Sequence, residues 1–487
     1  LTFQRELALY NNETDFRWIG SPGEIIKYEL NNVSQPTIWN VSDPTNAFNQ
    51  EYTAEAGKVV FQSQSSAVEE FVVFQGSEFP SPFIFGNVAN QNLKANTSFD
   101  GVIVTHPEFE QEAELIAQFH RDHDDLDVEV VTTREIYNEF SAGRQDISAI
   151  RDYAKYVYEA GNQLKYLLLF GDCSYDYKDR INRNTNFVPT YESRESFDPI
   201  RSYSSDDYYG FFEESEGEWI EDKVGDHTLE IGIGRLPAKT KEEARAMVDK
   251  IIYYTTSPNT LGEWRSEITY VGDDGDRNIH TSQIEGLSNL VDTTYAQYII
   301  HKVLLDAFSQ TGSGSSERSP LASAALKTRI KNGSFIVNFL GHGNERLWMD
   351  EEILTQADIA ELTNRNKLPI FVTATCEFGR YDNPIQVSGA ENLLLMEQGG
   401  GIALLTTSRP VFASTNDSLN RAFHQHMFKR ESGGGLRLGD VTRLTKNGGL
   451  EGPVNRNFTL LGDPMMMPAY PKIDIILDET GIDTLSA

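Results

Sequence analysis

Residues 335–384, FIVNFLGHGNERLWMDEEILTQADIAELTNRNKLPIFVTATCEFGRYDNP, contain the pattern that decides the fold. Two short apolar runs, 335–340 and 369–375, are rich in β-branched and aromatic residues, which predicts strands buried on both faces. Between them, Thr355 followed by Asp358 forms a capping box, which predicts the start of a helix. A strand, a helix and a second strand in this order predict a parallel pair within an α/β sheet.

Each predicted strand is followed by a residue suited to acyl transfer. His342 follows the first strand, flanked by Gly341 and Gly343, and Cys376 follows the second. Ligands bind outside the carboxyl ends of parallel strands, so we expect both side chains at one edge of the sheet. A thiolate attacks a carbonyl carbon while an imidazole moves the protons. We therefore predict Cys376 as the nucleophile and His342 as the acid–base residue.

Two backbone N–H groups beside these residues are candidates for an oxyanion site. Gly343 has no side chain, so its N–H group can approach the oxygen of a tetrahedral intermediate closely. The N–H group of Cys376 lies at the nucleophile itself. We predict that Gly343 and Cys376 together stabilise the oxyanion.

Both signals also have structural interpretations. A single buried cysteine is usually an inert packing residue, and glycines commonly bracket turns. Because the histidine and the cysteine each follow a predicted parallel strand of their own, the combination favours a catalytic pair.

Composition excludes several classes of function. The 487 residues include 42 Lys and Arg against 73 Asp and Glu, and the net charge of -31 disfavours nucleic acid and anionic membrane surfaces. The two cysteines, Cys173 and Cys376, cannot form a disulfide framework. The longest apolar runs are far shorter than a membrane span. The chain begins at Leu1 without the features of a signal peptide, which indicates a mature or trimmed chain.

The patterning predicts four segments. Residues 1–98 alternate like short antiparallel strands and form a β-rich N-terminal domain. Residues 99–257 and 258–471 alternate strands with amphipathic helices and form two α/β subdomains, the second of them catalytic. Residues 472–487 begin a following β domain. The predicted fold class is therefore a three-layer α/β/α arrangement with mainly parallel sheets behind a β-rich leader.

Several motifs resemble one known family, the gingipain-type cysteine peptidases, which are relatives of caspases in fold. The resemblance covers about residues 99–471 and is carried, in the expected order, by LLLFGDCSYDYK (167–178), SSDDYYGFF (204–212), LEIGIGRLPAKT (229–240), TATCEFGRYDNP (373–384) and LLGDPMMMPAYP (460–471). It implies a caspase-like fold and supports His342 and Cys376 as the catalytic pair. Thr375 departs from the pattern, because many relatives have alanine before the cysteine.

The resemblance also implies an acidic residue that orients the histidine. Relatives place it after the strand that corresponds to residues 267–272, and Asp274 is the best match by position. A solvated acidic turn is the alternative interpretation of this stretch.

Four residues are predicted to bind substrate. Glu377 and Arg380 follow the catalytic cysteine, where loop residues commonly line a pocket. Thr407 and Ser408 end another predicted strand at the same edge, where relatives build the walls of the substrate site.

Catalysis by this pair requires no cofactor, but the resemblance allows a structural calcium ion. Asp172, Asp206 and Asp207 are the candidate ligands, although no stretch has the complete pattern of a calcium-binding loop. His120 and His123 are spaced like metal ligands, but a solvated helix end is the preferred interpretation.

The motifs CEFGRYDNP and FGDCSYDY are most similar to the branch of the family that acts as sortase and signal peptidase of the type IX secretion system in Bacteroidetes. That resemblance implies removal of C-terminal secretion signals, with transfer to a surface glycolipid amine, at the extracellular face of the outer membrane. The implied partners are exported proteins with C-terminal secretion domains, a PorV-like outer-membrane protein and lipopolysaccharide. A secreted gingipain-like endopeptidase and a catalytically silent surface scaffold are the alternatives.

Overall fold

The chain divides into two compact units, residues 1–90 and 91–487. The computed structural model describes residues 5–76, 81, 83–84, 86–195, 197–198, 200–213, 216, 227–312, 317–431, 434–449 and 453–471. The predicted β segment at 472–487 lies outside the described residues. The first unit ends before the predicted boundary at residue 98, because the chain from Gln91 onward already bonds to the second unit. The Gln91 side chain donates to the carbonyl oxygen of Glu135 at 2.8 Å.

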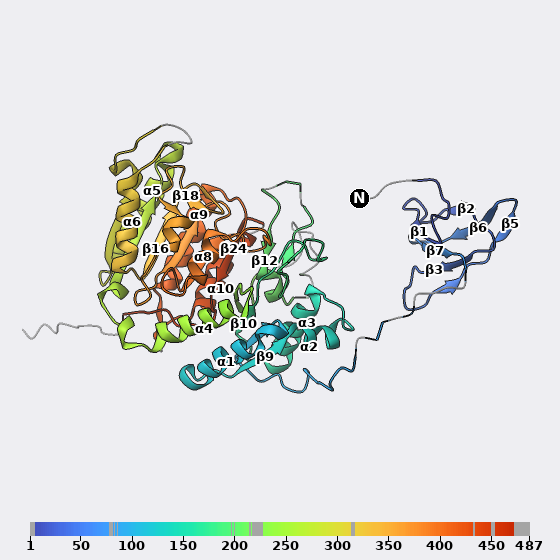
Figure 1. Ribbon diagram of the computed structural model, residues 1–487, viewed down its shortest axis with the longest axis horizontal. Helices are drawn as coiled ribbons and strands as arrows, with labels where there is room; N and C mark the ends of the chain where they lie inside the picture. Colours follow the sequence, from blue (N-terminus) through green and yellow to red (C-terminus); the bar gives the residue numbers. More distant parts are fainter. Residues whose placement is uncertain are drawn as a thin grey trace, which may run out of the picture. The chain divides into compact units, whose positions relative to one another are not determined.

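Two antiparallel sheets form the N-terminal unit and enclose one apolar core (Figure 1). The first sheet has the order β1 (Glu13–Arg17), β7 (Glu70–Phe74), β3 (Thr37–Asn40) and β4 (Phe48–Asn49), and the second β2 (Ile25–Asn31), β6 (Lys58–Gln64) and β5 (Thr53–Glu55). Phe71 and Phe61 come from different sheets, and their rings meet edge to face at a centroid distance of 5.1 Å. This arrangement is the β-rich leader that the alternating pattern predicts.

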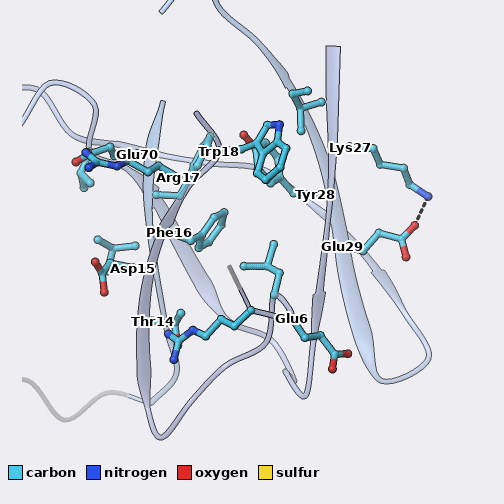
Figure 2. A pocket seen from close by; sticks show the side chains of 16 residues that line it. Glu6, Thr14, Asp15, Phe16, Arg17, Trp18, Lys27, Tyr28, Glu29 and Glu70 are labelled. Atoms are coloured by element: carbon cyan, nitrogen blue, oxygen red, sulfur yellow. Dashed lines mark hydrogen bonds and ion pairs between the residues drawn. The ribbon is translucent and has the colours of Figure 1, made fainter. Parts of the chain in front are cut away.

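A pocket of about 1030 Å³ in this unit is lined largely by residues of β1 and β2, which are edge strands of the two sheets (Figure 2). Its lining combines the rings of Phe16 and Tyr28 with charged side chains, among them Lys27 and Glu29, which pair with each other. None of the predicted catalytic residues lines this pocket, so it does not bear on the predicted chemistry.

One long sheet forms the centre of the second unit. Within the described residues its order is β15 (Ile299–Leu304), β14 (Glu267–Gly272), β16 (Ile336–Leu340), β20 (Ile370–Ala374), β21 (Ala403–Thr407), β24 (Phe458–Leu461), β13 (Gly232–Leu236), β10 (Tyr166–Phe170), β8 (Gly101–Thr105) and β9 (Val128–Thr132). The pairing is parallel except where β24 lies antiparallel to β21. The two predicted α/β subdomains are therefore halves of one sheet, with β24 between them.

Helices cover both faces of this sheet. The helices of the described part of this unit are α1 (Glu110–Asp124), α2 (Thr133–Phe140), α3 (Ile147–Gly161), α4 (Lys241–Thr256), α5 (Gly275–Thr294), α6 (Pro320–Asn332), α7 (Gln356–Ala360), α8 (Gly389–Leu395), α9 (Ala413–Met427), α10 (Leu438–Gly449) and α11 (Pro453–Arg456). Successive strand residues point to opposite faces, and every residue of β16 and β20 is buried. Both faces must therefore be covered, which confirms the predicted three-layer α/β fold.

Short elements connect these layers. They are the small sheets β11 (Tyr191–Glu192) with β12 (Ser204–Ser205), β17 (Gly343–Asn344) with β18 (Leu347–Trp348) and β19 (Leu354–Thr355), and β22 (Arg430–Glu431) with β23 (Gly434–Gly435), and the 3₁₀ turns η1 (Pro107–Phe109), η2 (Asp206–Gly210), η3 (Pro258–Thr260), η4 (Glu263–Ser266) and η5 (Leu305–Ala307). The predicted capping box forms: the Thr355 hydroxyl accepts from the Asp358 N–H group, and the Asp358 carboxylate accepts from Thr355 in return. That box starts α7 after the β17–β19 sheet.

A buried ion pair fixes η2 against the middle of the sheet. Arg235 of β13 is fully buried, and its guanidinium donates to both carboxylate oxygens of Asp206 at 2.7 and 2.8 Å. It also donates to the carbonyl oxygens of Gly171 and Val188 at 2.8 and 2.7 Å. All partners are satisfied, which is the condition for a buried charge to be tolerated.

His120 differs from its sequence-based interpretation as part of a solvated helix end. It is fully buried, with Nδ1 2.6 Å from Asp124 and Nε2 2.7 Å from Asp463. Burial acts to lower its pKa, but the charges of Asp463 and Asp124 prevail and raise the pKa to about 9. The histidine therefore links α1 to the end of β24, a contact across the chain that spacing alone could not reveal. His123 remains exposed.

Among the described residues, no helix combines the length and apolar character needed to cross a membrane.

Arg235→Met should destabilise the second unit by about 3–5 kcal/mol, because it leaves the Asp206 carboxylate buried without its partner. Urea unfolding followed by circular dichroism measures the change. Asp249→Asn is the control, because the Arg245 and Asp249 side chains are 55% and 45% exposed and such pairs contribute less than about 1 kcal/mol. Equal urea midpoints of unfolding for the two variants would contradict the role of Arg235 as the buried partner of Asp206.

Candidate active site

Parallel pairing brings His342 and Cys376 to one edge of the sheet. β16 and β20 are in register from Ile336 with Ile370 to Leu340 with Ala374. Each of the two predicted catalytic residues is the second residue beyond the last pair, so they leave adjacent strands at the same level. Cys376 is partly exposed, whereas Cys173 is buried. The accessible thiol is therefore the one at the strand end next to that of the histidine.

The two loops approach each other closely at Gly343. A Cβ atom at this position would lie 2.7 Å from the Thr375 hydroxyl and 2.9 Å from the carbonyl oxygen of Leu347. Both separations are shorter than a side chain can tolerate, so the loop after His342 needs glycine here to pack against the residue before Cys376. The buried Thr375 hydroxyl has no hydrogen-bond partner among the described residues.

The carboxylate that orients His342 belongs to Asp273, not to the predicted Asp274. Asp273 Oδ2 lies 2.9 Å from Nδ1 of the imidazole and accepts the backbone N–H of His342 at 2.7 Å. Its other oxygen accepts the N–H of Gly275 at 2.8 Å. Asp274 instead accepts a hydrogen bond from the Gln310 side chain at 2.6 Å. The predicted position was thus wrong by one residue.

Strand register explains this correction. β14 pairs with β16 up to Gly272 with Leu340, and the Asp273 N–H continues the ladder by donating to the carbonyl oxygen of Leu340 at 3.2 Å. Asp273 therefore lies beside Gly341, where a Cβ atom would be 2.4 Å from the Cβ of Asp273. Gly341 was the sequence signal that could have indicated Asp273, because a glycine at this position makes room for the Asp273 side chain.

The pair is electrostatically complementary. Burial acts to raise the pKa of Asp273, but hydrogen bonds from His342 and Gly275 outweigh it and hold the pKa below its usual range. The hydrogen bond to Asp273 raises the pKa of His342 to about 8 against the partial burial of the ring. Asp273 thus fixes the ring by Nδ1 and stabilises its charged form, which leaves Nε2 for proton transfer.

Two further side chains surround the His342 ring. Asp276 places Oδ2 3.3 Å from Nε2 of His342. The His280 ring meets the His342 ring edge to face, with a centroid distance of 5.1 Å and an interplanar angle of 87°. Neither residue was singled out from the sequence, because each becomes adjacent to His342 only through the start of α5.

The backbone at the predicted oxyanion site is consistent with its role. The N–H of Met349 donates to the carbonyl oxygen of His342 at 2.9 Å, and Gly343 is paired with Trp348 in the β17–β18 ladder. In an antiparallel ladder the bonded positions alternate, so the Gly343 N–H points away from β18. Among the described residues, no backbone acceptor lies on the N–H of Cys376.

Glu377 and Arg380, the two residues after Cys376 that are predicted to bind substrate, lie on the loop that follows β20. Arg380 donates to Glu345 at 2.7 Å and contacts Glu377 at 3.2 Å, and all three side chains keep part of their surface exposed. Burial raises the pKa of Glu377 against the opposing charge of Arg380. Glu345, which follows Gly343 by two residues, was missed in the sequence. It joins the His342 loop to the Cys376 loop.

Thr407 and Ser408 do not line an accessible wall, contrary to their predicted role in substrate binding. Both are fully buried. The Thr407 hydroxyl donates to the carbonyl oxygen of Thr375, and the Ser408 hydroxyl donates to that of Ser204 at 3.0 Å. Thr407 therefore holds the backbone next to Cys376 in place, whereas Ser408 satisfies a carbonyl oxygen of β12.

Two of the three acidic residues predicted as calcium ligands, Asp206 and Asp207, are paired with basic side chains. Asp206 is paired with Arg235, and the carboxylate of Asp207 lies 2.8 Å from Lys446 and 3.3 Å from Arg456. The Asp172 carboxylate lies 3.8 Å from the Lys239 ammonium, and burial raises its pKa. Both of its buried oxygens lack a hydrogen-bond partner among the described residues, so a calcium ion at Asp172 stays a prediction.

The fold and this site define a class of protein. An α/β sheet with helices on both faces, a partly exposed cysteine and a carboxylate-oriented histidine at adjacent parallel strand ends is the arrangement of a caspase-like cysteine peptidase. The chain belongs to Peptidase family C25, whose sequence profile matches residues 94–469. The predicted membership among the gingipain-type cysteine peptidases is confirmed.

Known relatives agree with this assignment. Gingipain R2 of Porphyromonas gingivalis is 24% identical over 346 residues, a match that covers 66% of this chain and 40% of the relative. The crystal structure of the Arg-specific cysteine proteinase gingipain R (RgpB) superposes with a TM-score of 0.56 at 21% identity over 78% of this chain and 80% of that one. Dimeric latent PorU from Porphyromonas gingivalis superposes with a TM-score of 0.54 at 21% identity over 96% of this chain and 40% of that one. The chain thus spans less than half the length of gingipain R2 and of PorU.

Asp273→Asn should lower the pKa of His342 from about 8 toward the ordinary value of about 6.5, because it removes the negative hydrogen-bond acceptor at Nδ1. In the wild type, the charged imidazole stabilises the folded state at low pH, and this contribution is lost as the pH rises through about 8. In Asp273→Asn, this pH-dependent decrease in stability should be absent. NMR titration of ¹³C-labelled histidine rings measures the pKa.

Asp274→Asn is the matched control for that titration. Its carboxylate bonds to Gln310 rather than to the ring, so the pKa of His342 should stay near 8. If the pKa of His342 fell strongly in Asp274→Asn and did not change in Asp273→Asn, Asp274 would be the residue that orients the histidine, as the sequence predicts.

Gly343→Ala should reduce kcat/KM by about 100-fold, because the new methyl group displaces the His342 loop from the cysteine. Adding Thr375→Ala to the same chain should recover part of the loss by removing the nearer of the two clashing atoms. Thr375→Ala alone should change activity little, since that hydroxyl makes no hydrogen bond among the described residues. Full activity in Gly343→Ala would contradict the close approach.

Proposed function

We propose that this protein is a cysteine endopeptidase that forms a thioester between Cys376 and the acyl part of its substrate. The observation that carries the proposal is the imidazole of His342, fixed by Asp273, at the strand end next to the one from which Cys376 emerges. A packing cysteine would not require an oriented histidine beside it, and the thiol would not need to be accessible.

In the acylation step, the thiol proton passes to Nε2 of His342 and the sulfur attacks the carbonyl carbon of the scissile peptide bond. The N–H groups of Gly343 and Cys376 hold the oxyanion. The carbon–nitrogen bond then breaks, and His342 gives the proton to the leaving amine. The amino-terminal part of the substrate remains as a thioester on Cys376.

In the second step, a nucleophile attacks the thioester carbonyl and releases the thiolate. Attack by water gives hydrolysis, and His342 accepts the proton of the water. Attack by an amine gives transpeptidation, with the same proton movement. The site performs identical chemistry up to this point, so the accepting nucleophile distinguishes a protease from a sortase.

The proposed substrates are exported proteins with C-terminal secretion domains, as for a PorU-type processing enzyme. The motifs CEFGRYDNP and FGDCSYDY support this assignment. A second support is the extent of the likeness to PorU, which includes most of the N-terminal unit, whereas the likeness to gingipain R covers 78% of the chain. The proposed location is the cell surface, with a PorV-like protein as partner and lipopolysaccharide as the source of the amine.

A secreted gingipain-like endopeptidase is the second candidate function. The sequence match to gingipain R2 over 346 residues favours it. An enzyme of this kind would cleave generic peptides and would yield only hydrolysis products. A catalytically silent scaffold, in contrast, would leave Cys376 unreactive toward a peptide electrophile.

Cys376→Ala in the source bacterium should leave exported proteins with uncleaved C-terminal domains, as detected by mass spectrometry of the exported fraction. Cys173→Ala is the matched control, because that thiol is buried away from solvent, and processing should continue. Normal processing in Cys376→Ala would refute the proposed role.

Products from the wild-type chain then separate the candidates. New C-termini that carry an amine adduct support the sortase, whereas free carboxylates alone support the gingipain-like hydrolase.

A further inference from the structure

A second kind of chemistry is available at the same histidine. Asp276, His280 and His342 each offer one ligand atom, and these three atoms lie within 4.8 Å of one another. Within the described part of the chain, it is the one group of three or more histidine, cysteine and acidic residues that lie close enough together to hold a metal ion. Asp276 and His280 have no role in the proposed peptidase mechanism, so their arrangement around His342 requires another explanation.

The donor set is that of a zinc site. Two imidazoles and one carboxylate are ligands that Zn²⁺ prefers, with water in the fourth position of a tetrahedral site. Ligand atoms about 2.0–2.2 Å from zinc in a tetrahedron stand about 3.3–3.6 Å apart. Asp276 Oδ2 and His342 Nε2 are already 3.3 Å apart. The His280 ligand atom lies within 4.8 Å of the other two, so at most a small movement of this ring completes three-fold coordination.

His280 supplies an independent observation. Its side chain is only 4% exposed, and Nδ1 has no hydrogen-bond partner among the described residues. A buried polar atom without a partner is unfavourable unless a ligand satisfies it. The His280 ring also lies directly against the His342 ring.

The backbone and the neighbouring charge complete the site. Asp276, Arg277 and Asn278 have φ values of 49°, 60° and 63°, and this left-handed stretch precedes the regular part of α5 that carries His280. Asp273 binds Nδ1 of His342 at 2.9 Å. A carboxylate on the far nitrogen of a ligating histidine is the usual second-layer support of a zinc ligand.

We propose that Asp276, His280 and His342 bind Zn²⁺, and that the bound ion reversibly inhibits the peptidase. Zn²⁺ on Nε2 of His342 occupies the nitrogen that must exchange protons with the thiol and the leaving amine. Metal binding itself does not depend on the proposed function, whereas its inhibitory consequence does.

The binding experiment uses the full chain with Cys376→Ala, so that the thiolate cannot serve as a ligand. Zn²⁺ titration against a chromophoric chelator should give one equivalent of bound metal. Adding His280→Gln should weaken the affinity by more than about 100-fold, since it removes a direct ligand whereas loss of an outer partner alone costs about 10–100-fold. Adding Asp274→Asn should leave the affinity unchanged, because Asp274 bonds to Gln310.

The activity experiment uses the chain with Cys376 intact. Zn²⁺ should inhibit peptide cleavage, a chelator should restore it, and His280→Gln should cleave the peptide without zinc inhibition. If the protein has no peptidase activity, the binding experiment still tests the site.

Two results would overturn the proposal. Binding that disappears in Cys376→Ala but persists in His280→Gln with Cys376 intact would place the metal between Cys376 and His342. No stoichiometric binding in Cys376→Ala would exclude the site altogether.

Discussion

The register of three adjacent parallel strands is the constraint on which the rest of the active unit depends. β14, β16 and β20 pair without a slip, so that Asp273, His342 and Cys376 leave the sheet beyond paired positions at one edge. A slip of one residue would turn each side chain to the other face of the sheet. The catalytic geometry is therefore set by hydrogen bonds of the buried backbone, and the glycines at 341 and 343 permit the loops to meet above it.

The first half of the sheet supports the loop that follows the nucleophile. Asp382 on this loop is fully buried and paired with Arg409, and its carbonyl oxygen accepts the N–H of Tyr175 at 2.9 Å. Buried Cys173 contacts the carbonyl oxygen of Tyr381 at 3.7 Å. These contacts join the end of β10 to the segment after Cys376, so the two predicted subdomains belong to one compact unit. In a chain with a net charge of -31, cations such as Arg409 and Arg235 offset the cost of burying acidic groups.

The sequence was sufficient for the fold class and for the position of His342 and Cys376 at neighbouring strand ends, because strand periodicity and a glycine-flanked histidine are local signals. It was insufficient for Asp273, since two adjacent aspartates differ only in how the strand register directs them. Thr407 and Ser408 illustrate another limit: a position at the sheet edge was predictable, but their burial beneath the loop after Cys376 was not. Asp276 and His280 become neighbours of His342 through a left-handed turn that no motif indicates.

The pH dependence of Cys376 alkylation tests the central claim most directly, because Cys173 is buried and only one thiol is accessible. If the imidazole held by Asp273 acts on this sulfur, the alkylation rate of the wild type should show a step near pH 8, the pKa of His342. The step should vanish in His342→Ala. An identical rate profile in both proteins would contradict the account, because it would mean that the histidine and the cysteine do not interact.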